Sequence, residues 1–292
     1  MPQSVFRMTG GSANFTSALS LGRNKMGYST FPQRSAPRVE VFGGTLTTEY
    51  LYLGEDRGAH CHILVTNGTL RANNVVKCGR CSGNADTTNT LEICGSGIFY
   101  RNGAIYNDDA SVLRLYVHDG GEMRINTLNN SRHGDDNSGK TRLKGSTYGQ
   151  MHLLLDGGTM RKTDGDGNSN GSYANLTSAQ IGAKGATLRS YGADCLYNFF
   201  TPFTTQEGIE RDGGVTLNAV TATAAISFRA PMQYNGPTVL QAGGLTFAGT
   251  GALPPATDFA MTGGSSRFPT RRRPWARPRS AKRTPHRRSR CA

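Results

Sequence analysis

The feature that most constrains this chain is a phrase that recurs along residues 5–174. Apolar and polar side chains alternate, a pair of small residues interrupts them, and the alternation then resumes. Residues 39–56, VEVFGGTLTTEYLYLGED, show the phrase most clearly, and related text occupies 5–24 and 63–81. The interrupting pairs are Gly10-Gly11, Gly43-Gly44, Asn67-Gly68, Gly95-Ser96, Gly120-Gly121 and Gly157-Gly158.

Alternation with a period of two is typical of strands that bury one face, and glycine permits the positive φ that a sharp corner needs. Before the pairs, the residues expected on the buried face are Val39, Val41, Ile63, Val65, Leu91, Ile93, Leu153 and Leu155. After the pairs, they are Leu19, Leu21, Leu51, Leu53, Val76 and Cys78. Two positions beyond each pair stands an apolar or small residue: Ala13, Leu46, Leu70, Ile98, Met123 or Met160.

Three short strands in roughly 25 residues cannot bury a face by themselves, but stacked copies form one continuous interior. We therefore predict an all-β chain in which residues 1–266 form a single-stranded parallel β-helix, a β-solenoid. Variable spacing between the copies predicts loops on one side of the coil. A β-sandwich also contains many short strands, but it gives no reason for one phrase to recur.

The positive charge of the chain belongs to its end. The formal net charge is +13, and residues 267–292 hold ten Arg and one Lys but no acidic residue. Removing these 11 from the 33 basic residues leaves 22 against 20 acidic ones, so the body is close to neutral. Six cysteines are too few for a disulfide scaffold in 292 residues. No apolar run is long enough for a membrane-spanning helix.

Residues 175–264 resemble the autotransporter-associated β-strand repeat of large bacterial surface proteins. The match rests on YNGPTVLQAGGLTFAGTGALPPATDF, which contains a Gly236-Pro237-Thr238 entry, an AGGLTF strand over 242–247 and a GxGxLP exit over 249–254. Upstream, QIGAKGATLRSYG and GGVTLNA resemble the strands that precede this unit. The earlier copies, in residues 5–174, keep the same alternation and spacing, but their residues match the family repeat less closely.

The resemblance implies a right-handed parallel β-helix carried outside the cell, on the bacterial surface, as a passenger segment. This chain departs from complete family members because it shows neither an export signal nor a C-terminal run of amphipathic strands. Its six cysteines are also unusual for such passengers. Because the sequence begins inside a copy of the repeat, we expect the chain to be a fragment of a larger protein.

Two groups of residues suggest metal chemistry. Cys61, Cys78, Cys81 and Cys94, with His60 and His62, are residue types that bind zinc. Cys78, however, occupies the position of Leu21 and Leu53 in other copies, which predicts a buried apolar role. TDGDGNSNGS places Asp164, Asp166, Asn168 and Asn170 at calcium-loop spacing but lacks the Gly and Glu of an EF-hand. We predict no metal or cofactor site, with a looser calcium loop as the alternative.

Enzymes that cleave pectin share the β-helix fold, so their motifs are the relevant comparison. Asp108-Asp109, His133-Gly134 and Arg142-Leu143-Lys144 occur in the polygalacturonase order, but the spacing and the flanking residues differ. Glycoside hydrolysis needs two carboxylates at a defined separation, and Asp135 and Asp136 lie in a long loop. We predict no catalytic residue; a polysaccharide-cleaving lyase or hydrolase is the alternative.

Residues 267–292 are expected to be a disordered Arg/Pro-rich tail, because such composition cannot bury a core. The abrupt change after Ser266 also fits a frameshifted or truncated gene end. The alternative is a tail that binds nucleic acid or another anionic polymer, with Trp275 as a stacking residue. The sequence thus favours a non-catalytic structural or adhesive β-solenoid whose loops bind surface glycans or proteins.

Overall fold

The computed structural model describes residues 4–22, 35–54, 58–74, 76–78, 87–107, 111–129, 149–163, 171–190, 196–220, 223–255 and 257–267. Every element within these ranges is a strand, which confirms the all-β prediction. This part of the chain contains no helix with the length and hydropathy to cross a membrane.

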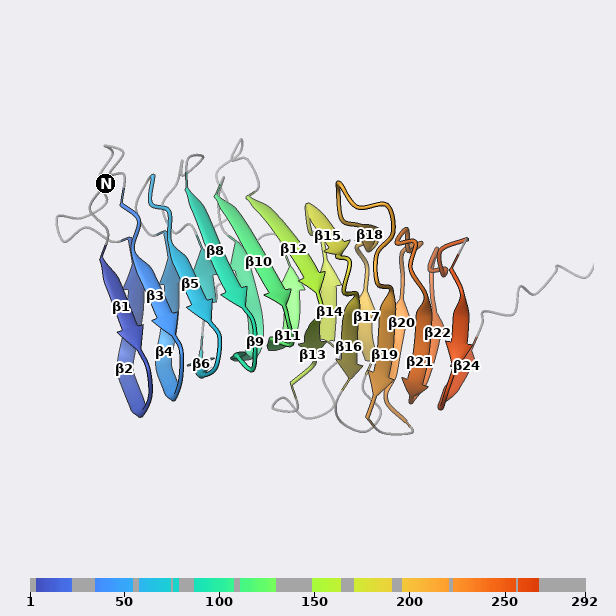
Figure 1. Cartoon of the computed structure of the whole chain (residues 1–292), viewed down its shortest axis with the longest axis horizontal. Coiled ribbons are helices and arrows are strands. Elements are labelled where there is room, and N and C mark those ends of the chain that lie inside the picture. The colour runs from blue at the N-terminus through green and yellow to red at the C-terminus, as the bar shows by residue number, and fades with distance from the viewer. Residues whose placement is uncertain are drawn as a thin grey trace, which may run out of the picture.

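Eight of the strands form sheet A, and each pairs with its neighbours in parallel. In their order across the sheet they are β1 (Val5–Met8), β3 (Arg38–Val41), β5 (His62–Val65), β8 (Thr88–Ile93), β10 (Val112–His118), β12 (Gln150–Asp156), β15 (Ser178–Ile181) and β18 (Thr204–Thr205). Figure 1 shows them side by side along the long axis of the molecule.

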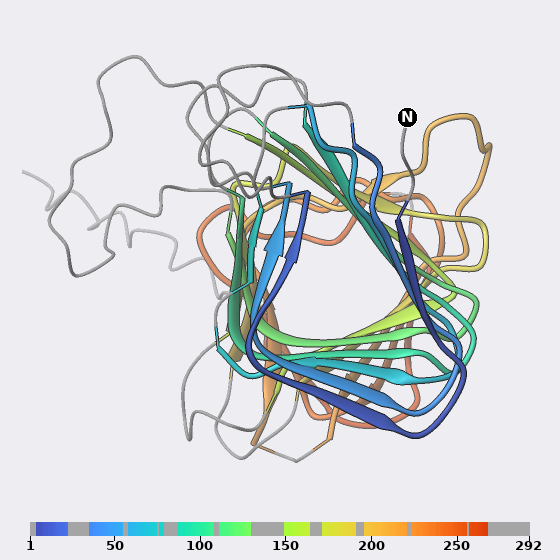
Figure 2. The same ribbon diagram turned by 90° about the vertical axis from the view of Figure 1, so that its left-hand side faces the viewer.

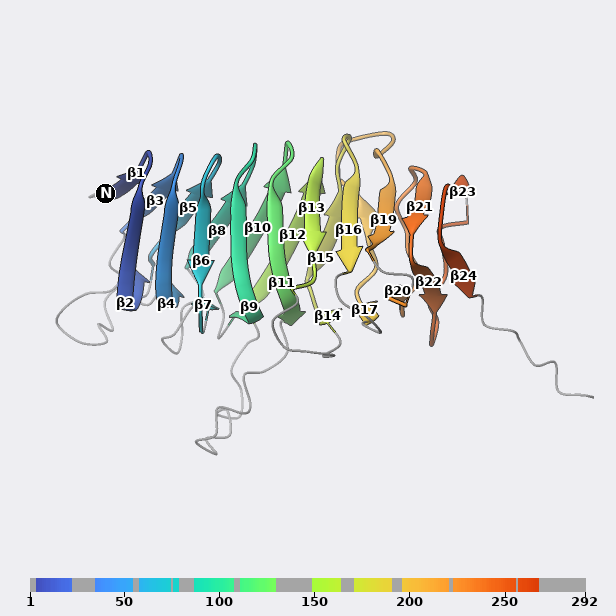
Figure 3. The ribbon, with the colours of Figure 1, turned by 90° about the horizontal axis from the view of Figure 1, so that it is seen from below.

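The other sixteen strands form sheet B, which is also parallel and which Figure 3 shows from below. In the first half they are β2 (Ser12–Leu21), β4 (Thr45–Leu53), β6 (Thr69–Ala72), β7 (Val76–Cys78), β9 (Ile98–Asn107) and β11 (Glu122–Asn129). In the second half they are β13 (Gly158–Arg161), β14 (Gly171–Ala174), β16 (Ala186–Ser190), β17 (Leu196–Phe199), β19 (Val215–Ala219), β20 (Ala225–Phe228), β21 (Thr238–Ala242), β22 (Gly244–Phe247), β23 (Phe259–Met261) and β24 (Ser265–Arg267).

Each of the first eight rungs, meaning full turns of the chain, contributes a strand of sheet A and then one or two strands of sheet B, whereas the last two rungs, with β21 and β22 and with β23 and β24, contribute strands to sheet B alone. In β2, β4, β9 and β11 a single long strand spans the sheet B part of the rung, whereas in the other rungs two separate strands do so, as in β6 and β7 or in β19 and β20. Viewed along the axis, the rungs enclose one interior with a roughly three-sided outline (Figure 2). The chain is therefore a parallel β-helix, not a sandwich, and its right-handed sense stays a prediction.

The interior consists of rows in which equivalent residues of consecutive rungs stack on one another. One row on sheet A contains Met8, Val41, Val65, Ile93, Val117, Leu155 and Ile181. One row on sheet B contains Leu46, Leu70, Phe99, Met123, Met160, Leu188, Leu217 and Leu240. All of these side chains are buried, so every rung adds apolar surface to one shared core.

The predicted inward direction of Leu21, Leu53 and Cys78 is confirmed. The three residues share one register position on adjacent strands, and all are buried. Cys78 thus fills a position that leucine fills in the two preceding rungs, as a small apolar side chain does.

The position predicted for the small-residue pair of this rung, Gly95-Ser96, is wrong by one residue. Four residues, 94–97, join β8 to β9, whereas three residues, 66–68, join β5 to β6. The register consequently places Phe99, not Ile98, beside Leu70, and Phe99 is the fully buried residue of the two. A shift of one residue exchanges the two faces of a strand, so the longer corner explains the error.

The C-terminal part also differs from the sequence interpretation. The text AGGLTF is not one strand, because β21 ends at Ala242 and β22 begins at Gly244. Gly243 lies between them with φ +74°, and a Cβ there would come within 2.3 Å of the Ala219 Cβ. The segment therefore turns a corner at glycine. Strand β24 includes Arg267, one residue beyond the predicted end of the β-helix, and residues 268–292 lie outside the described part of the chain.

Candidate functional site on the outer face of sheet A

The outer face of sheet A gathers polar side chains from several rungs. Outward positions alternate with core positions along each strand, and the parallel register aligns them between rungs. His62, Thr90, Arg114, His152 and Ser178 form one such row. Side chains that are about 25 to 40 residues apart in the sequence therefore lie next to each other on this face.

A polar cluster occupies the end of this face where β8 and β10 finish. The Glu92 carboxylate accepts hydrogen bonds from two imidazoles on neighbouring rungs. His62 Nε2 lies 2.9 Å from Oε2, and His118 Nε2 lies 3.1 Å from Oε1. All three side chains are partly exposed to solvent. The carboxylate thus joins three consecutive rungs from the outside.

His118 has a carboxylate on each side of its ring. Its Nδ1 lies 2.8 Å from Asp119 Oδ2, opposite the contact of Nε2 with Glu92. Burial lowers the pKa of His118, but the hydrogen bonds to Asp119 and Glu92 outweigh burial and raise the pKa above its ordinary value. Hydrogen bonds from Lys184 and His118 hold the pKa of Asp119 below its ordinary value. The cluster therefore favours a charged imidazolium between two carboxylates.

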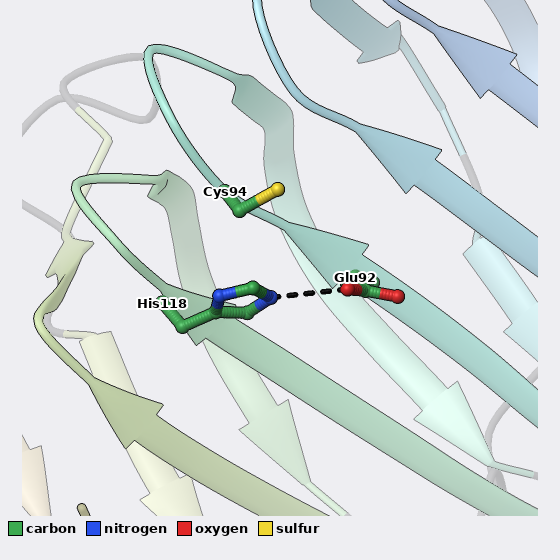
Figure 4. A group of neighbouring side chains, drawn as sticks. All are labelled: Glu92, Cys94 and His118. Atoms are coloured by element: carbon green, nitrogen blue, oxygen red, sulfur yellow. Dashed lines mark hydrogen bonds and ion pairs between the residues drawn. The ribbon is translucent and has the colours of Figure 1, made fainter.

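Cys94 follows the last residue of β8 and is partly exposed beside this cluster. One ligand atom from each of Glu92, Cys94 and His118 lies within 4.8 Å of the other two. Figure 4 shows the thiol and the imidazole on the same side of the sheet as the Glu92 carboxylate. Carboxylate, thiolate and imidazole are all zinc ligands, so this group is the part of the described chain that could hold a metal ion.

A shallow groove of about 410 Å³ lies further along the same face. Its lining includes Arg114, Tyr116, His152, Leu154, Gln180 and Glu207, which come from β10, β12, β15 and the segment after β18. His152 is fixed in place, with Nδ1 2.9 Å from Ser178 Oγ and Nε2 3.2 Å from Gln150 Oε1. The groove thus presents one aromatic ring among several polar groups, across consecutive rungs.

The structure separates the cysteines that the sequence suggested as zinc ligands. Cys61 and Cys78 are buried, and the Cys61 sulfur accepts a hydrogen bond from the Gly54 amide at 3.2 Å. Cys94 lies on the outer face of sheet A, where sequence reasoning did not pair it with Glu92 or His118. Cys81 lies outside the described residues. The sequence did contain a signal for this pair. Glu92 and Cys94 are two residues apart at the end of an alternating run, and residues two apart on a strand point to the same face.

The residues of the two remaining candidate sites, the calcium loop and the polysaccharide-cleaving site, lie outside the described part of the chain. The calcium-like residues Asp164, Asp166, Asn168 and Asn170 lie outside the described residues. So do the enzyme-like residues Asp108, Asp109, His133, Gly134, Asp135, Asp136, Arg142, Leu143 and Lys144. The calcium-loop and polysaccharide-cleavage alternatives therefore stay predictions.

Comparisons with protein-family models, with curated proteins and with solved structures found no match for this chain. The resemblance to the autotransporter-associated repeat is therefore a sequence interpretation, and the fold is the part of it that the structure supports.

Proposed function

We propose that this chain is a non-catalytic, structural and adhesive segment of a large exported bacterial surface protein. In this proposal the β-helix is a rigid rod, and the outer face of sheet A binds an extended glycan. The proposal rests on the resemblance of residues 175–264 to a surface-protein repeat and on the groove beside Tyr116.

Rigidity is the property that the ladder of strands supplies. Backbone hydrogen bonds connect each rung to the next on both sheets, and the core rows are continuous along the axis. A rung cannot move alone without breaking contacts to two neighbours, since stability in a solenoid depends on nearest-neighbour interfaces. Such a rod holds recognition surfaces at fixed spacing.

The groove is the observation that carries the binding part of the proposal. Tyr116 offers the apolar face of a ring with a polar tip, a combination suited to a ligand that is partly apolar and partly hydroxylated. Arg114, on the same strand as Tyr116, adds hydrogen-bond donors, and Gln180, two rungs further along, adds donors and an acceptor. Because the groove crosses the strands, it fits a chain-like ligand better than a compact one.

The lining of the groove also favours binding over cleavage. Glu207 is the one carboxylate among the residues that line it, and it is exposed. Hydrolysis of a glycosidic bond ordinarily uses two carboxyl groups placed on either side of the bond. The groove residues therefore support recognition of a polysaccharide without turnover.

Isothermal titration of the full chain against a panel of soluble bacterial and host polysaccharides tests the proposal. We expect saturable binding of at least one polymer and a loss of about tenfold or more in affinity for Tyr116→Ala and Arg114→Ala. Tyr52→Ala and Arg189→Ala are the matched controls, because these residues point outward from sheet B. A chain ending at Ser266 checks that the basic tail is not the binding element.

Two results would overturn the proposal. Equal binding by wild type, Tyr116→Ala and Arg114→Ala would remove the groove as the binding surface. Release of new reducing ends or unsaturated products from the bound polymer would show an enzyme in place of a scaffold.

A further inference from the structure

We infer that Glu92, Cys94 and His118 bind one Zn²⁺ ion on the outer face of sheet A. The three residues supply a carboxylate oxygen, a thiolate sulfur and an imidazole nitrogen, and the relevant atoms lie within 4.8 Å of one another (Figure 4). This inference is independent of the proposed glycan binding, because it rests on different residues and needs no partner.

The separation of the ligand atoms is close to that of a bound site. With zinc bonds of about 2.0–2.3 Å in tetrahedral geometry, neighbouring ligand atoms are roughly 3.3–3.6 Å apart. The Glu92 Oε1 and His118 Nε2 atoms are already 3.1 Å apart, in a hydrogen bond whose proton the ion displaces to solvent. The Cys94 sulfur lies within 4.8 Å of both atoms, so it must move roughly 1 Å closer to join the same shell.

The backbone positions of all three ligands are fixed by the parallel ladder. Glu92 pairs with Tyr116 between β8 and β10, and His118 is the last residue of β10. The Cys94 amide donates to the Val65 carbonyl at 2.9 Å, so Cys94 is held against the preceding rung. Ligands on paired strands need little ordering before they bind a metal.

Two further residues orient the ligands as the outer shell of a zinc site does. Asp119 contacts His118 Nδ1 at 2.8 Å, which directs Nε2 toward Glu92 and Cys94. Lys184 in turn pairs with Asp119. His62 holds the other oxygen of Glu92 at 2.9 Å. A carboxylate on the distal nitrogen of a ligating histidine fixes the tautomer and raises the basicity of the ring.

The ligand types select the metal. Thiolate and imidazole ligands suit zinc, whereas magnesium and calcium prefer sites made of oxygen atoms alone. Three protein ligands leave the fourth tetrahedral position for water or for a donor atom from a ligand. Because the ligands come from two consecutive rungs, and His62 from a third, the ion also ties the rungs together from outside.

Equilibrium dialysis of the full chain against Zn²⁺ alone tests this inference. We expect wild type to bind one ion whose affinity falls at least about 100-fold in Cys94→Ser and in His118→Gln. Asp119→Asn should weaken binding by about tenfold, since asparagine keeps the shape and tolerates the positive φ of this residue, +50°, but removes the charge. Co²⁺ in place of Zn²⁺ should give a thiolate-to-metal absorption band that disappears in Cys94→Ser.

Cys81→Ser and Cys291→Ser are the controls, because each removes a thiol elsewhere in the sequence, and far-ultraviolet circular dichroism verifies the fold of every variant. Binding at wild-type affinity in both Cys94→Ser and His118→Gln would overturn the inference. So would loss of the ion in Cys81→Ser or Cys291→Ser with retention in Cys94→Ser, because the ion would then be held by other cysteines.

Discussion

The buried carboxylate of Asp212 accepts a hydrogen bond from the backbone amide of Gly236, one rung further along the chain, at 2.8 Å. The same carboxylate accepts hydrogen bonds from the amides of Gly214 and Asn235, both at 2.8 Å, and from the Thr205 hydroxyl at 2.6 Å. One side chain therefore satisfies backbone groups where two rungs turn from sheet A toward sheet B.

Asp212→Ala should lower the free energy of unfolding by about 3 kcal/mol, because it leaves several buried donors without an acceptor. Urea denaturation followed by circular dichroism measures the change. Asp258→Ala is the control, since Asp258 is 88% exposed and lies 3.7 Å from Arg211 in a surface ion pair. That control should change stability by less than about 0.5 kcal/mol. Equal effects of the two substitutions would contradict the role assigned to Asp212.

Gly44→Ala should destabilise the β-helix, whereas Gly10→Ala should not. Gly44 has φ +74°, and a Cβ at this position would lie 2.2 Å from the Gly11 carbonyl oxygen of the preceding rung. A Cβ at Gly10 meets no atom within 4 Å. We expect a loss of about 1–3 kcal/mol for Gly44→Ala in urea denaturation. A Gly44→Ala variant as stable as Gly10→Ala would show that the rungs do not approach this closely at the corner.

Phe199→Ala should cost about 3–5 kcal/mol of stability. Phe199 is fully buried, and its ring stacks on that of Tyr173 with centroids 4.7 Å apart and planes within 1°. Phe200, the next residue, is 48% exposed and contacts the Arg229 guanidinium, so Phe200→Ala should cost less than about 1 kcal/mol. Thermal unfolding of the pair measures the difference, and a reversed order would mean that the β17 faces are exchanged.

The imidazole of His152 should titrate below its ordinary range. Burial, together with the nearby Arg114 guanidinium, lowers the pKa of His152 below 6.5. Because the folded-state pKa is lower than that of the unfolded chain, folding favours the neutral ring. The resulting stability is fully present above about pH 6.5 and is lost as the pH falls through the lowered pKa.

Proton NMR of the His152 ring across pH 4–8 measures this midpoint directly. Arg114→Ala should move the midpoint upward, and Arg189→Ala on sheet B should leave it unchanged. A midpoint above about 6.5 in wild type would contradict the described surroundings of His152.

The sequence predicts the core rows well, because a period of two is imposed by strand geometry itself. Val39, Val41, Ile63 and Val65 are buried as expected. The error at Gly95 has a local cause, since one additional corner residue reverses the inward face. The sequence offers a second small pair here, Ser96-Gly97, and Phe99 stands two residues beyond it. The division of residues 242–247 between β21 and β22 at Gly243 was missed for a similar local reason, because a Gly-Gly pair is compatible with a strand as well as with a corner.

The candidate site was less accessible to sequence reasoning. Glu92 and His118 are neighbours only because β8 and β10 pair in one particular register. Predicting their contact from sequence needs the lengths of every intervening corner, and one of those was misjudged. The groove depends in the same way on the register of β10, β12 and β15. Side chains on the outer face also have no requirement to be apolar, so composition gives little guidance there.

The stacking of rungs in parallel and in register is the central claim, since the groove and the proposed zinc site both depend on it. Interstrand nuclear Overhauser effects of the methyl-labelled chain with its α-protons retained measure it most directly at Val65, Ile93 and Val117, which share one row of sheet A. We predict methyl contacts from Ile93 to both valines, a contact between the Cys94 amide proton and Val65, and no short α-proton to α-proton contacts between these strands. Strong α-proton to α-proton contacts, which are typical of antiparallel pairs, or methyl contacts displaced by one residue, would contradict the account.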